Sequence, residues 1–340
     1  MHMADALLSP VIGGTFWAAS AAMIGLATRK ISSEADGPKT VLMGVLGAFV
    51  FAAQMINFTI PGTGSSGHFG GGLLLAVLLG PWRAFITLAS VLVIQALFFA
   101  DGGLIALGCN IINMAFFPAF VAWPFIYRPV AGNAHSGPRL AAGSITAATA
   151  GILMGAMSVV LQTTFSGISD LPFRTFTLFM LPIHLCIGVV EGLVTWAVLS
   201  FVAKTEPGLL AGRNRLSKPG LILPAFVIAA MITGAVLSWF ASSRPDGLEW
   251  SITRASGKEA LTAPDEKLHT FLASVQKRVA LLPDYGFRNR KEASPAIPAP
   301  LSAVDPGASI SGIVGSLMVM LLAGSVGLLL RRRAPEAPEA

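Results

Sequence analysis

Long apolar segments separated by short polar ones dominate the chain. A helix of roughly 17–25 apolar residues is long enough to cross the hydrocarbon core of a bilayer. Segments that reach this length lie at 11–28, 41–60, 82–100, 104–127, 140–165, 175–203, 220–241 and 309–330. We therefore expect an all-α integral membrane protein that crosses the bilayer several times.

A further apolar segment, 69–80, is too short to cross by itself, because a helix rises about 1.5 Å per residue. The preceding stretch, 61–68, contains Pro, Gly and Ser and has no helical character. Non-helical backbone is tolerated at membrane depth only where protein or water surrounds it. Two interpretations stay open: a re-entrant loop at 61–68 that folds into the bundle from the outer face, or an ordinary outer loop followed by a short tilted helix.

A polar, basic stretch with Gly and Pro at 206–219 divides the chain and is expected to be a cytoplasmic linker. Residues 1–205 before it hold seven apolar segments, which predicts a seven-segment bundle. Residues 220–333 hold two helices joined by a long polar segment, 242–308, which predicts a two-helix module. We expect no regular structure in two stretches rich in Pro and Ala, 291–306 and 334–340.

The distribution of basic residues predicts the orientation. With the N-terminus outside and the short segment counted as a pass, the short outer segments carry Arg174 against three acids, Asp5, Asp101 and Asp170. The inner loops then carry Arg29, Lys30, Lys39, Arg83, Arg128, Arg139, Lys204, Arg213, Arg215, Lys218 and Arg331–Arg333. Basic loops stay in the cytoplasm. This pattern predicts a protein of the cytoplasmic membrane with an extracytoplasmic N-terminus, an extracytoplasmic 242–308 segment and a cytoplasmic C-terminus.

Composition narrows the class further. The chain is 54% hydrophobic and 12% charged, with a net charge of +6, whereas soluble domains are about 25% charged. The basic residues lie at the ends of apolar segments, so the partner they indicate is the lipid bilayer and no nucleic acid. Cys109 and Cys186 lie inside apolar segments and are expected to be small core residues. The sequence contains no HExxH, Walker A or GxSxG motif.

Two histidines, His2 and His68, both fall on the outer side. A chain that starts Met1–His2 offers an amine, a backbone amide and an imidazole, which can chelate one metal through fused five- and six-membered rings. His68 could fill the fourth position, and four nitrogens in a plane suit Ni(II), Cu(II) or low-spin Co(II) better than Zn(II). On these residues alone, a simple polar role for His2 near the terminus is favoured. Polar candidates to orient the ligands are Asn57, Ser65, Ser66 and Asn110.

Other polar residues have less specific interpretations. His184 and Glu191, in segment 175–203, are seven positions apart and share one helix face. They could form structural pairs, with each other or with neighbouring helices, or belong to a proton path; structural pairing is favoured because no second acid is in reach. His269, in the polar outer segment, is expected to be solvated.

Several motifs in order resemble one known family. They are Met1–Pro10 (MHMADALLSP), Ala52–Phe58 (AAQMINF), Pro61–His68 (PGTGSSGH), Leu78–Trp82 (LLGPW), Gln95–Gly103 (QALFFADGG), Ala106–Met114 (ALGCNIINM), His184 and Glu191–Gly192. Residues 1–205 resemble the CbiM/NikM family, the substrate-binding membrane components of energy-coupling-factor transporters for cobalt and nickel. One departure is Cys109, where the family pattern leads us to expect Ala.

The rear unit resembles the partner component of the same systems, a PDGLE module similar to NikN and CbiN, here fused behind the first. The resemblance rests on Pro245–Glu249 (PDGLE) and Leu282–Tyr285 (LPDY). Asp246 and Glu249 could attract cations, or the Pro-Asp-Gly sequence could simply form a turn, and we favour the turn.

The resemblance implies a function and a site. It implies uptake of Co²⁺ or Ni²⁺, bound by the amine of Met1, the backbone and side chain of His2, and His68. It also implies a membrane scaffold subunit and cytoplasmic ATPase subunits as partners, no enzymatic activity in this chain and no permanently bound cofactor. Two alternatives stay open: a vitamin-binding component of the same transporter type, and a membrane-embedded metalloenzyme using His184 and Glu191. The sequence does not rank nickel against cobalt.

Overall fold

The protein is largely helical. The structure, a computed structural model, describes residues 2–33, 37–134, 136–210, 219–258, 261, 266–288 and 304–330. In these ranges six helices are long and apolar enough to cross a membrane: Pro10–Ser33, Pro81–Phe98, Leu107–Ala131, Gly137–Ser166, Phe173–Thr205 and Pro306–Leu330. Two shorter apolar helices, Lys39–Gln54 and Pro219–Ala235, accompany them.

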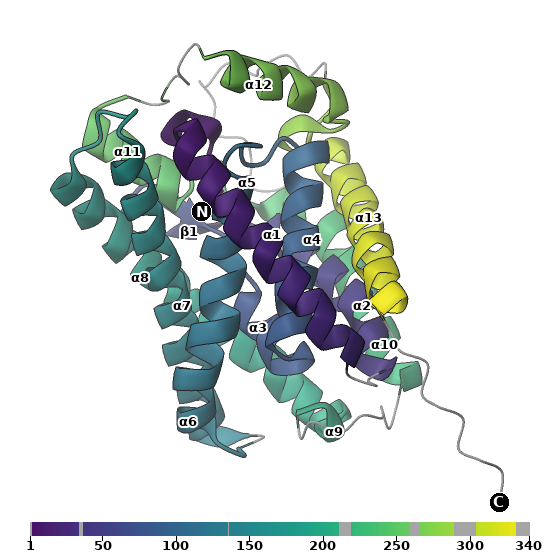
Figure 1. The fold of residues 1–340 in the computed structure, drawn as a ribbon. Coiled ribbons are helices and arrows are strands. Elements are labelled where there is room, and N and C mark those ends of the chain that lie inside the picture. The colour runs from purple at the N-terminus through teal and green to yellow at the C-terminus, as the bar shows by residue number, and fades with distance from the viewer. Residues whose placement is uncertain are drawn as a thin grey trace, which may run out of the picture.

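Figure 1 labels these elements along the chain. The main helices are α1 (Pro10–Ser33), α2 (Gly37–Gln54), α3 (Gly72–Leu79), α4 (Pro81–Phe98), α7 (Gly137–Ser166), α8 (Phe173–Thr205), α10 (Pro219–Ala235) and α13 (Pro306–Leu330). Between α4 and α7, α5 (Leu107–Ile111) continues through a π-helical stretch, Ile112–Tyr127, into α6 (Arg128–Ala131).

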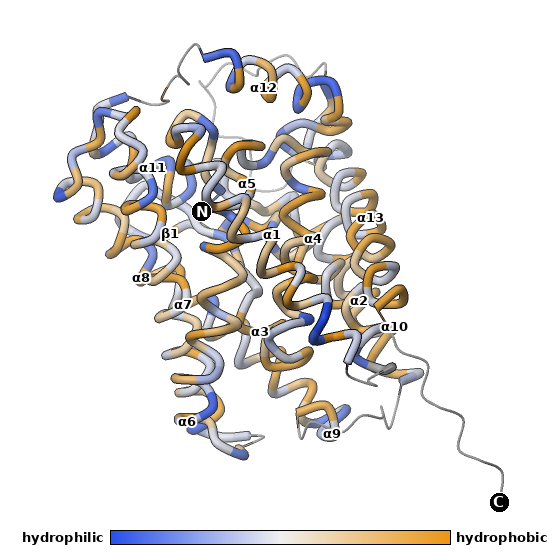
Figure 2. The backbone as a smooth tube through the Cα atoms, in the orientation of Figure 1, coloured by the Kyte–Doolittle hydropathy of each residue, from blue (hydrophilic) through white to orange (hydrophobic). Residues whose placement is uncertain are grey.

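Polar and apolar parts of the molecule are segregated along its length. The short helices α11 (Gly247–Ser256) and α12 (Lys267–Val279) lie at one end, and α6 and α9 (Pro207–Leu210) lie at the other. Figure 2 shows mostly hydrophobic residues in the region between them, with hydrophilic residues at both ends and at a few places between. This is the arrangement of a multi-pass membrane protein, in which apolar faces meet lipid and polar segments meet water.

The prediction of a helix over 41–60 is wrong in its last part, and the fold is not purely helical. Helix α2 ends at Gln54, and strands β1 (Phe58–Ile60) and β2 (Ser65–Gly67) form an antiparallel hairpin. Gly62 and Gly64, with φ of 77° and 80°, make its turn, a conformation that glycine adopts without steric cost. Phe58 and Ile60 continue the apolar run although their backbone is extended, and this misled the prediction.

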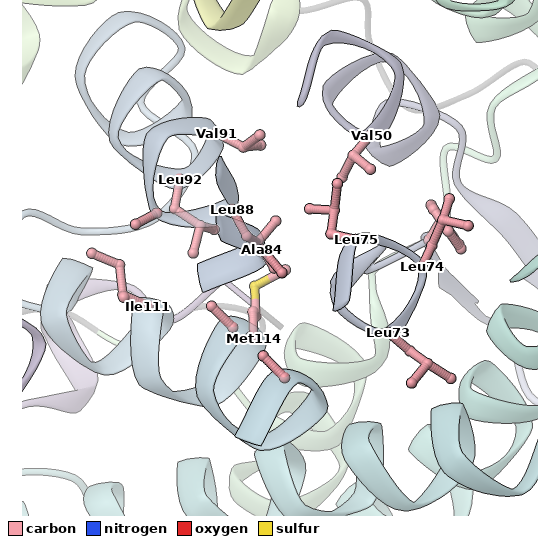
Figure 3. Close-up of a cluster of buried hydrophobic side chains, with 14 of the residues drawn as sticks. Val50, Leu73, Leu74, Leu75, Ala84, Leu88, Val91, Leu92, Ile111 and Met114 are labelled. Carbon is pink, nitrogen blue, oxygen red and sulfur yellow. The ribbon is translucent and has the colours of Figure 1, made fainter. Parts of the chain in front are cut away.

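The predicted short helix at 69–80 begins later than expected. Gly71 is left-handed, with φ of 79°, so α3 starts only at Gly72. Helix α3 is apolar on every side and almost wholly buried, as expected for a helix inside a bundle. Figure 3 shows Leu73, Leu74 and Leu75 pointing away from this helix in different directions, among side chains of the surrounding helices.

Other predicted boundaries also move. Helix α10 ends at Ala235 and a 3₁₀ turn, Leu237–Phe240, follows. Helix α13 starts at Pro306, inside the stretch expected to be irregular, because Asp305 accepts hydrogen bonds from Gly307 and Ala308 at its start. The start of the predicted linker is helical, as α9. Residues 211–218, 291–303 and the predicted tail 334–340 lie outside the described residues.

The rear helices pack closely against the front ones. A Cβ placed on Gly44 of α2 would lie 2.7 Å from the Met320 carbonyl oxygen of α13. The two rear helices approach each other as closely, since a Cβ on Gly312 of α13 would lie 2.3 Å from the Gly234 carbonyl oxygen of α10. Small residues let membrane helices approach this closely. The two units of the chain therefore form one bundle.

Candidate metal site

His2 and His68 lie together, as their outer-side positions predicted. Their rings are stacked, with centroids 5.2 Å apart and planes inclined by 20°. His2 belongs to the segment before α1, and His68 follows strand β2. The side chain of His2 is only 8% exposed. Met1, the third predicted ligand, lies outside the described residues.

Asn110, on α5, holds the segment that carries His2. Its Oδ1 accepts the Met3 amide at 2.8 Å, and its Nδ2 donates to the Met3 carbonyl at 3.3 Å. The Gly103 amide donates to the same carbonyl at 2.9 Å, and the Ala106 amide donates to Asp5 at 3.0 Å. Asn110 therefore fixes the backbone next to His2 and does not itself bond to the imidazole.

The partners of the His2 imidazole were not predicted from the sequence. Its Nε2 lies 3.1 Å from Gln95 Oε1, and its Nδ1 lies 3.3 Å from Asp101 Oδ1. The Tyr285 hydroxyl of the rear unit donates to Asp101 Oδ2 at 2.5 Å. Burial lowers the pKa of His2, although the Asp101 carboxylate opposes the shift. The neutral form, which can bind a metal, is thereby favoured.

His68 is oriented by the backbone around it. Its Nδ1 lies 3.2 Å from the Phe69 carbonyl oxygen. Because a carbonyl oxygen only accepts, Nδ1 carries the hydrogen and Nε2 carries the lone pair that a metal needs. Glu191 of α8 then accepts the Gly70 and Gly71 amides, at 2.7 and 3.0 Å. The backbone that follows His68 is thus anchored deep in the bundle.

His184 and Glu191 do not bond to each other. The His184 Nδ1 lies 2.7 Å from the Met180 carbonyl oxygen of its own helix, while Glu191 binds the loop amides described above. Both line a cavity of about 20 Å³, together with His68, Asn113, Asp246 and Gly247. A cavity of this size holds one water molecule.

Asn57, Ser65 and Ser66 contact the rear unit and have no recorded bond to either imidazole. The Ser66 amide donates to the Pro245 carbonyl at 2.8 Å, the Ser242 amide donates to the Asn57 carbonyl at 2.7 Å, and Ser65 Oγ lies 3.4 Å from the Pro245 carbonyl oxygen. The hairpin is therefore covered by the start of the PDGLE segment.

The Asp246–Glu249 pair is a helix cap, in keeping with the turn that we favoured. Asp246 Oδ1 accepts the Leu248 and Glu249 amides, both at 2.8 Å, and Glu249 Oε2 accepts the Asp246 amide at 3.2 Å. This reciprocal capping box starts α11. His269, expected to be solvated, is instead buried, with its Nε2 3.0 Å from the Leu8 carbonyl oxygen.

The kinds of donor available limit the sites that are possible. Among the residues that the structure describes, no group of three or more His, Cys, Asp and Glu side chains could hold a metal ion. A metal beside His2 and His68 would need donors of another kind as well, and the main-chain nitrogens of a chelating N-terminus are candidates.

Comparison with known proteins places this chain in a family. Residues 2–209 match CbiM, described as "Cobalt uptake substrate-specific transmembrane region", and residues 221–332 match the PDGLE domain. A "Putative fused nickel transport protein NikMN" of Archaeoglobus fulgidus is 34% identical over 95% of this chain and 96% of its own. The "Fused nickel transport protein NikMN" of Rhodobacter capsulatus is 30% identical over 98% of both chains.

A solved structure agrees with these relatives. A crystal structure described as a transition metal transporter matches with a TM-score of 0.53 and 30% identity, covering 60% of this chain and 93% of that one. The agreement of motifs, relatives and structure over most of the chain leads to one conclusion: the protein belongs to the CbiM family, with a PDGLE domain fused behind the CbiM region.

Proposed function

We propose that this chain is the substrate-specific membrane component of a system that takes up Ni²⁺ or Co²⁺ across the cytoplasmic membrane. The observation that carries the proposal is the stacked pair of partly buried imidazoles. His2 lies on the N-terminal segment and His68 follows strand β2. The nickel and cobalt transport named for its relatives supports it.

In this proposal the ion binds to four nitrogens. They are the Met1 amine, the His2 amide and Nδ1, and His68 Nε2. The ion arrives hydrated from outside and exchanges its water for these donors. Burial of His2 favours its ligating form, and the hairpin with the PDGLE turn over it separates the bound ion from solvent.

Energy for transport would come from separate subunits. The chain contains no Walker A motif, so a membrane scaffold subunit and cytoplasmic ATPases would reorient it and release the ion inside. In this arrangement the end with α11 and α12 faces outward with the N-terminus. The end with α6 and α9 faces the cytoplasm with the C-terminus and presents basic residues there.

The geometry supports the metal over the two alternatives. The cavity of about 20 Å³ beside His68 holds about one water molecule, so this site has no room for an organic ligand such as a vitamin. A metalloenzyme would need His184 and Glu191 to act on a substrate in the cavity that they share, but this cavity holds one water molecule and Glu191 is engaged by two backbone amides.

The experiment that tests the proposal is metal analysis of purified protein with a native N-terminus, beside a variant extended by a few residues before Met1. We expect one Ni²⁺ or Co²⁺ per chain in the native form and none in the extended form. Equal binding by both forms would contradict the amine-based site. Titration with each ion in turn then ranks nickel against cobalt.

A further inference from the structure

Two buried glutamines connect the His2 imidazole to the loop after His68. Gln54 Nε2 donates to the Gly70 carbonyl at 2.8 Å, Gln95 Nε2 donates to Gln54 Oε1 at 2.8 Å, and Gln95 Oε1 lies 3.1 Å from His2 Nε2. Gln54 ends α2 and is 5% exposed, while Gln95 on α4 is 0% exposed. Water therefore has little access to this chain of amides.

We call this series of hydrogen bonds, from the Gly70 carbonyl through Gln54 and Gln95 to His2, the relay. The direction of each of its hydrogen bonds follows from the bond at Gly70. A backbone carbonyl can only accept, so the Gln54 group that faces Gly70 must be its NH₂. Gln54 then presents its oxygen to Gln95, which must donate its own NH₂ and present its oxygen to His2. Because that oxygen only accepts, His2 Nε2 must carry the hydrogen. The lone pair of a neutral His2 is then on Nδ1.

Nδ1 is the nitrogen that a chelating His2 must use. With its own amide nitrogen, Nδ1 closes a six-membered ring around a metal, whereas Nε2 lies on the far side of the imidazole. The relay also leaves two acceptors, His2 Nδ1 and Asp101 Oδ1, 3.3 Å apart. The lone pairs of these two atoms repel each other, and a cation bound between or beside them would remove the repulsion.

We propose that Gln54 and Gln95 are positioning residues that fix the His2 tautomer with hydrogen on Nε2 and the metal-binding lone pair on Nδ1. This inference rests on the proposed function for its purpose and adds the residues that prepare the site. Gly70 is held from both sides, since its amide donates to Glu191 while its carbonyl accepts from Gln54. The relay thereby couples the loop after His68 to the orientation of His2.

The test has one readout that needs no metal. Protein labelled with ¹⁵N-histidine contains five imidazoles, and ¹⁵N shifts distinguish the two neutral tautomers; a His2→Gln variant assigns the His2 signals. We expect the metal-free wild type to show His2 with hydrogen on Nε2 only, and Gln95→Met to show a mixture. A wild-type His2 with hydrogen on Nδ1 would overturn the inference, even if Gln95→Met does not fold.

The second readout is metal affinity, measured by competition with a chelator. Loss of a partner that orients a ligand typically costs 10–100-fold in affinity, and we expect this for Gln95→Met, with a smaller loss for Gln54→Met. The double variant should lose no more than Gln95→Met, because both residues act through one path. Gln162→Met is the control: it removes a buried amide of α7 that bonds to Asn113, and should leave the tautomer unchanged.

The outcomes separate the two proposals. Wild-type affinity and a single tautomer in Gln95→Met would overturn the relay, while metal binding that an N-terminal extension abolishes would still support the proposed function. A wild type that binds no metal would contradict the proposed function, while the ¹⁵N shifts of the metal-free protein would still test the relay.

Discussion

At the scale of single residues, the site depends on buried polar side chains that come from both units of the chain. Asp101 lies between His2 Nδ1 and the Tyr285 hydroxyl, so one carboxylate joins a predicted ligand to the rear module. Burial and the Asp101 carboxylate raise the pKa of Tyr285, which keeps the phenol protonated as a donor. A hydrogen bond from a neutral donor to a carboxylate is among the stronger ones in proteins.

Tyr285→Phe tests whether the rear module tunes the metal site through this contact. Without the hydroxyl, Asp101 loses the donor that holds it toward His2, and we expect metal affinity to fall about tenfold, at the low end of effects for residues that support a ligand. Equilibrium competition with a chelator measures this. The other tyrosine of the chain, Tyr127, has no contact with the site, so Tyr127→Phe is the matched control. Equal affinities of the two variants would contradict the role given to Tyr285.

The side chain of Asp246 could act in two ways, as the N-cap of α11 or through its negative charge, which could attract cations. Asn is as good an N-cap as Asp, whereas Ala at this position costs about 1 kcal/mol. We therefore expect Asp246→Asn to keep the wild-type midpoint of thermal unfolding in detergent and Asp246→Ala to lower it. A loss of the same size in both variants would mean that the negative charge, and not the cap, stabilises the fold.

At the scale of elements, glycine contacts join the two rear helices to each other and to the front helices. The face of α13 at Gly312 meets α10 backbone so closely that no side chain fits. A tight crossing of this kind places the start of α13, and with it the end of the polar segment, against the C-terminal end of α10. The same close approach at Gly44 joins α13 to α2, the helix that ends in Gln54.

Gly312→Ala is expected to destabilise the protein by roughly 1–3 kcal/mol, the usual cost of overpacking. The added Cβ would lie 2.3 Å from the Gly234 carbonyl oxygen, which belongs to backbone and cannot rotate away. Gly14→Ala on α1 is the control, because its Cβ would meet nothing within 4 Å, and alanine favours helix by about 0.5–1 kcal/mol over glycine. Unfolding in detergent compares them. If the two variants had similar stability, α13 would have moved away from α10 with no loss in the free energy of unfolding.

At the scale of the whole molecule, the pattern of apolar residues predicted the long helices. It did not predict the hairpin or the contacts between side chains that are distant in sequence. Apolar runs mark α1, α4, α7, α8 and α13 because length and composition decide whether a helix can span a bilayer. The hairpin was missed because Phe58 and Ile60 are as apolar as the residues of a membrane-spanning helix. Gln54, Gln95 and Tyr285 were missed because their partners lie far away in sequence, and no periodicity reports such pairing. The signal available was the cost of burying an amide in an apolar segment.

The contact between hairpin and rear module is the largest feature that only the folded chain reveals. Trp250 Nε1 donates to the Thr63 carbonyl at 3.0 Å, and Ser66 Oγ donates to the Arg244 carbonyl at 2.8 Å. Together with the Asn57–Ser242 and Ser66–Pro245 bonds, these contacts place 242–250 over the loop that leads to His68. In the proposed function, we expect an ion entering from outside to pass between these two segments, which would then separate during loading.

A disulfide across this contact tests whether it opens. Thr59 is exposed, Ser242 is half-buried, and their hydroxyl oxygens are 3.0 Å apart, so Thr59→Cys with Ser242→Cys should form a disulfide under oxidising conditions. Cys186 is exposed and would be replaced by Ser, while Cys109 is buried. We expect oxidation to slow the exchange of bound ⁶³Ni with free Ni²⁺ at least tenfold, because the segments can no longer part, and reduction to restore it. Each single-cysteine variant should exchange at the wild-type rate under both conditions. If the oxidised double variant also exchanged at that rate, the ion would have to enter by a path that leaves the hairpin and the PDGLE segment in contact.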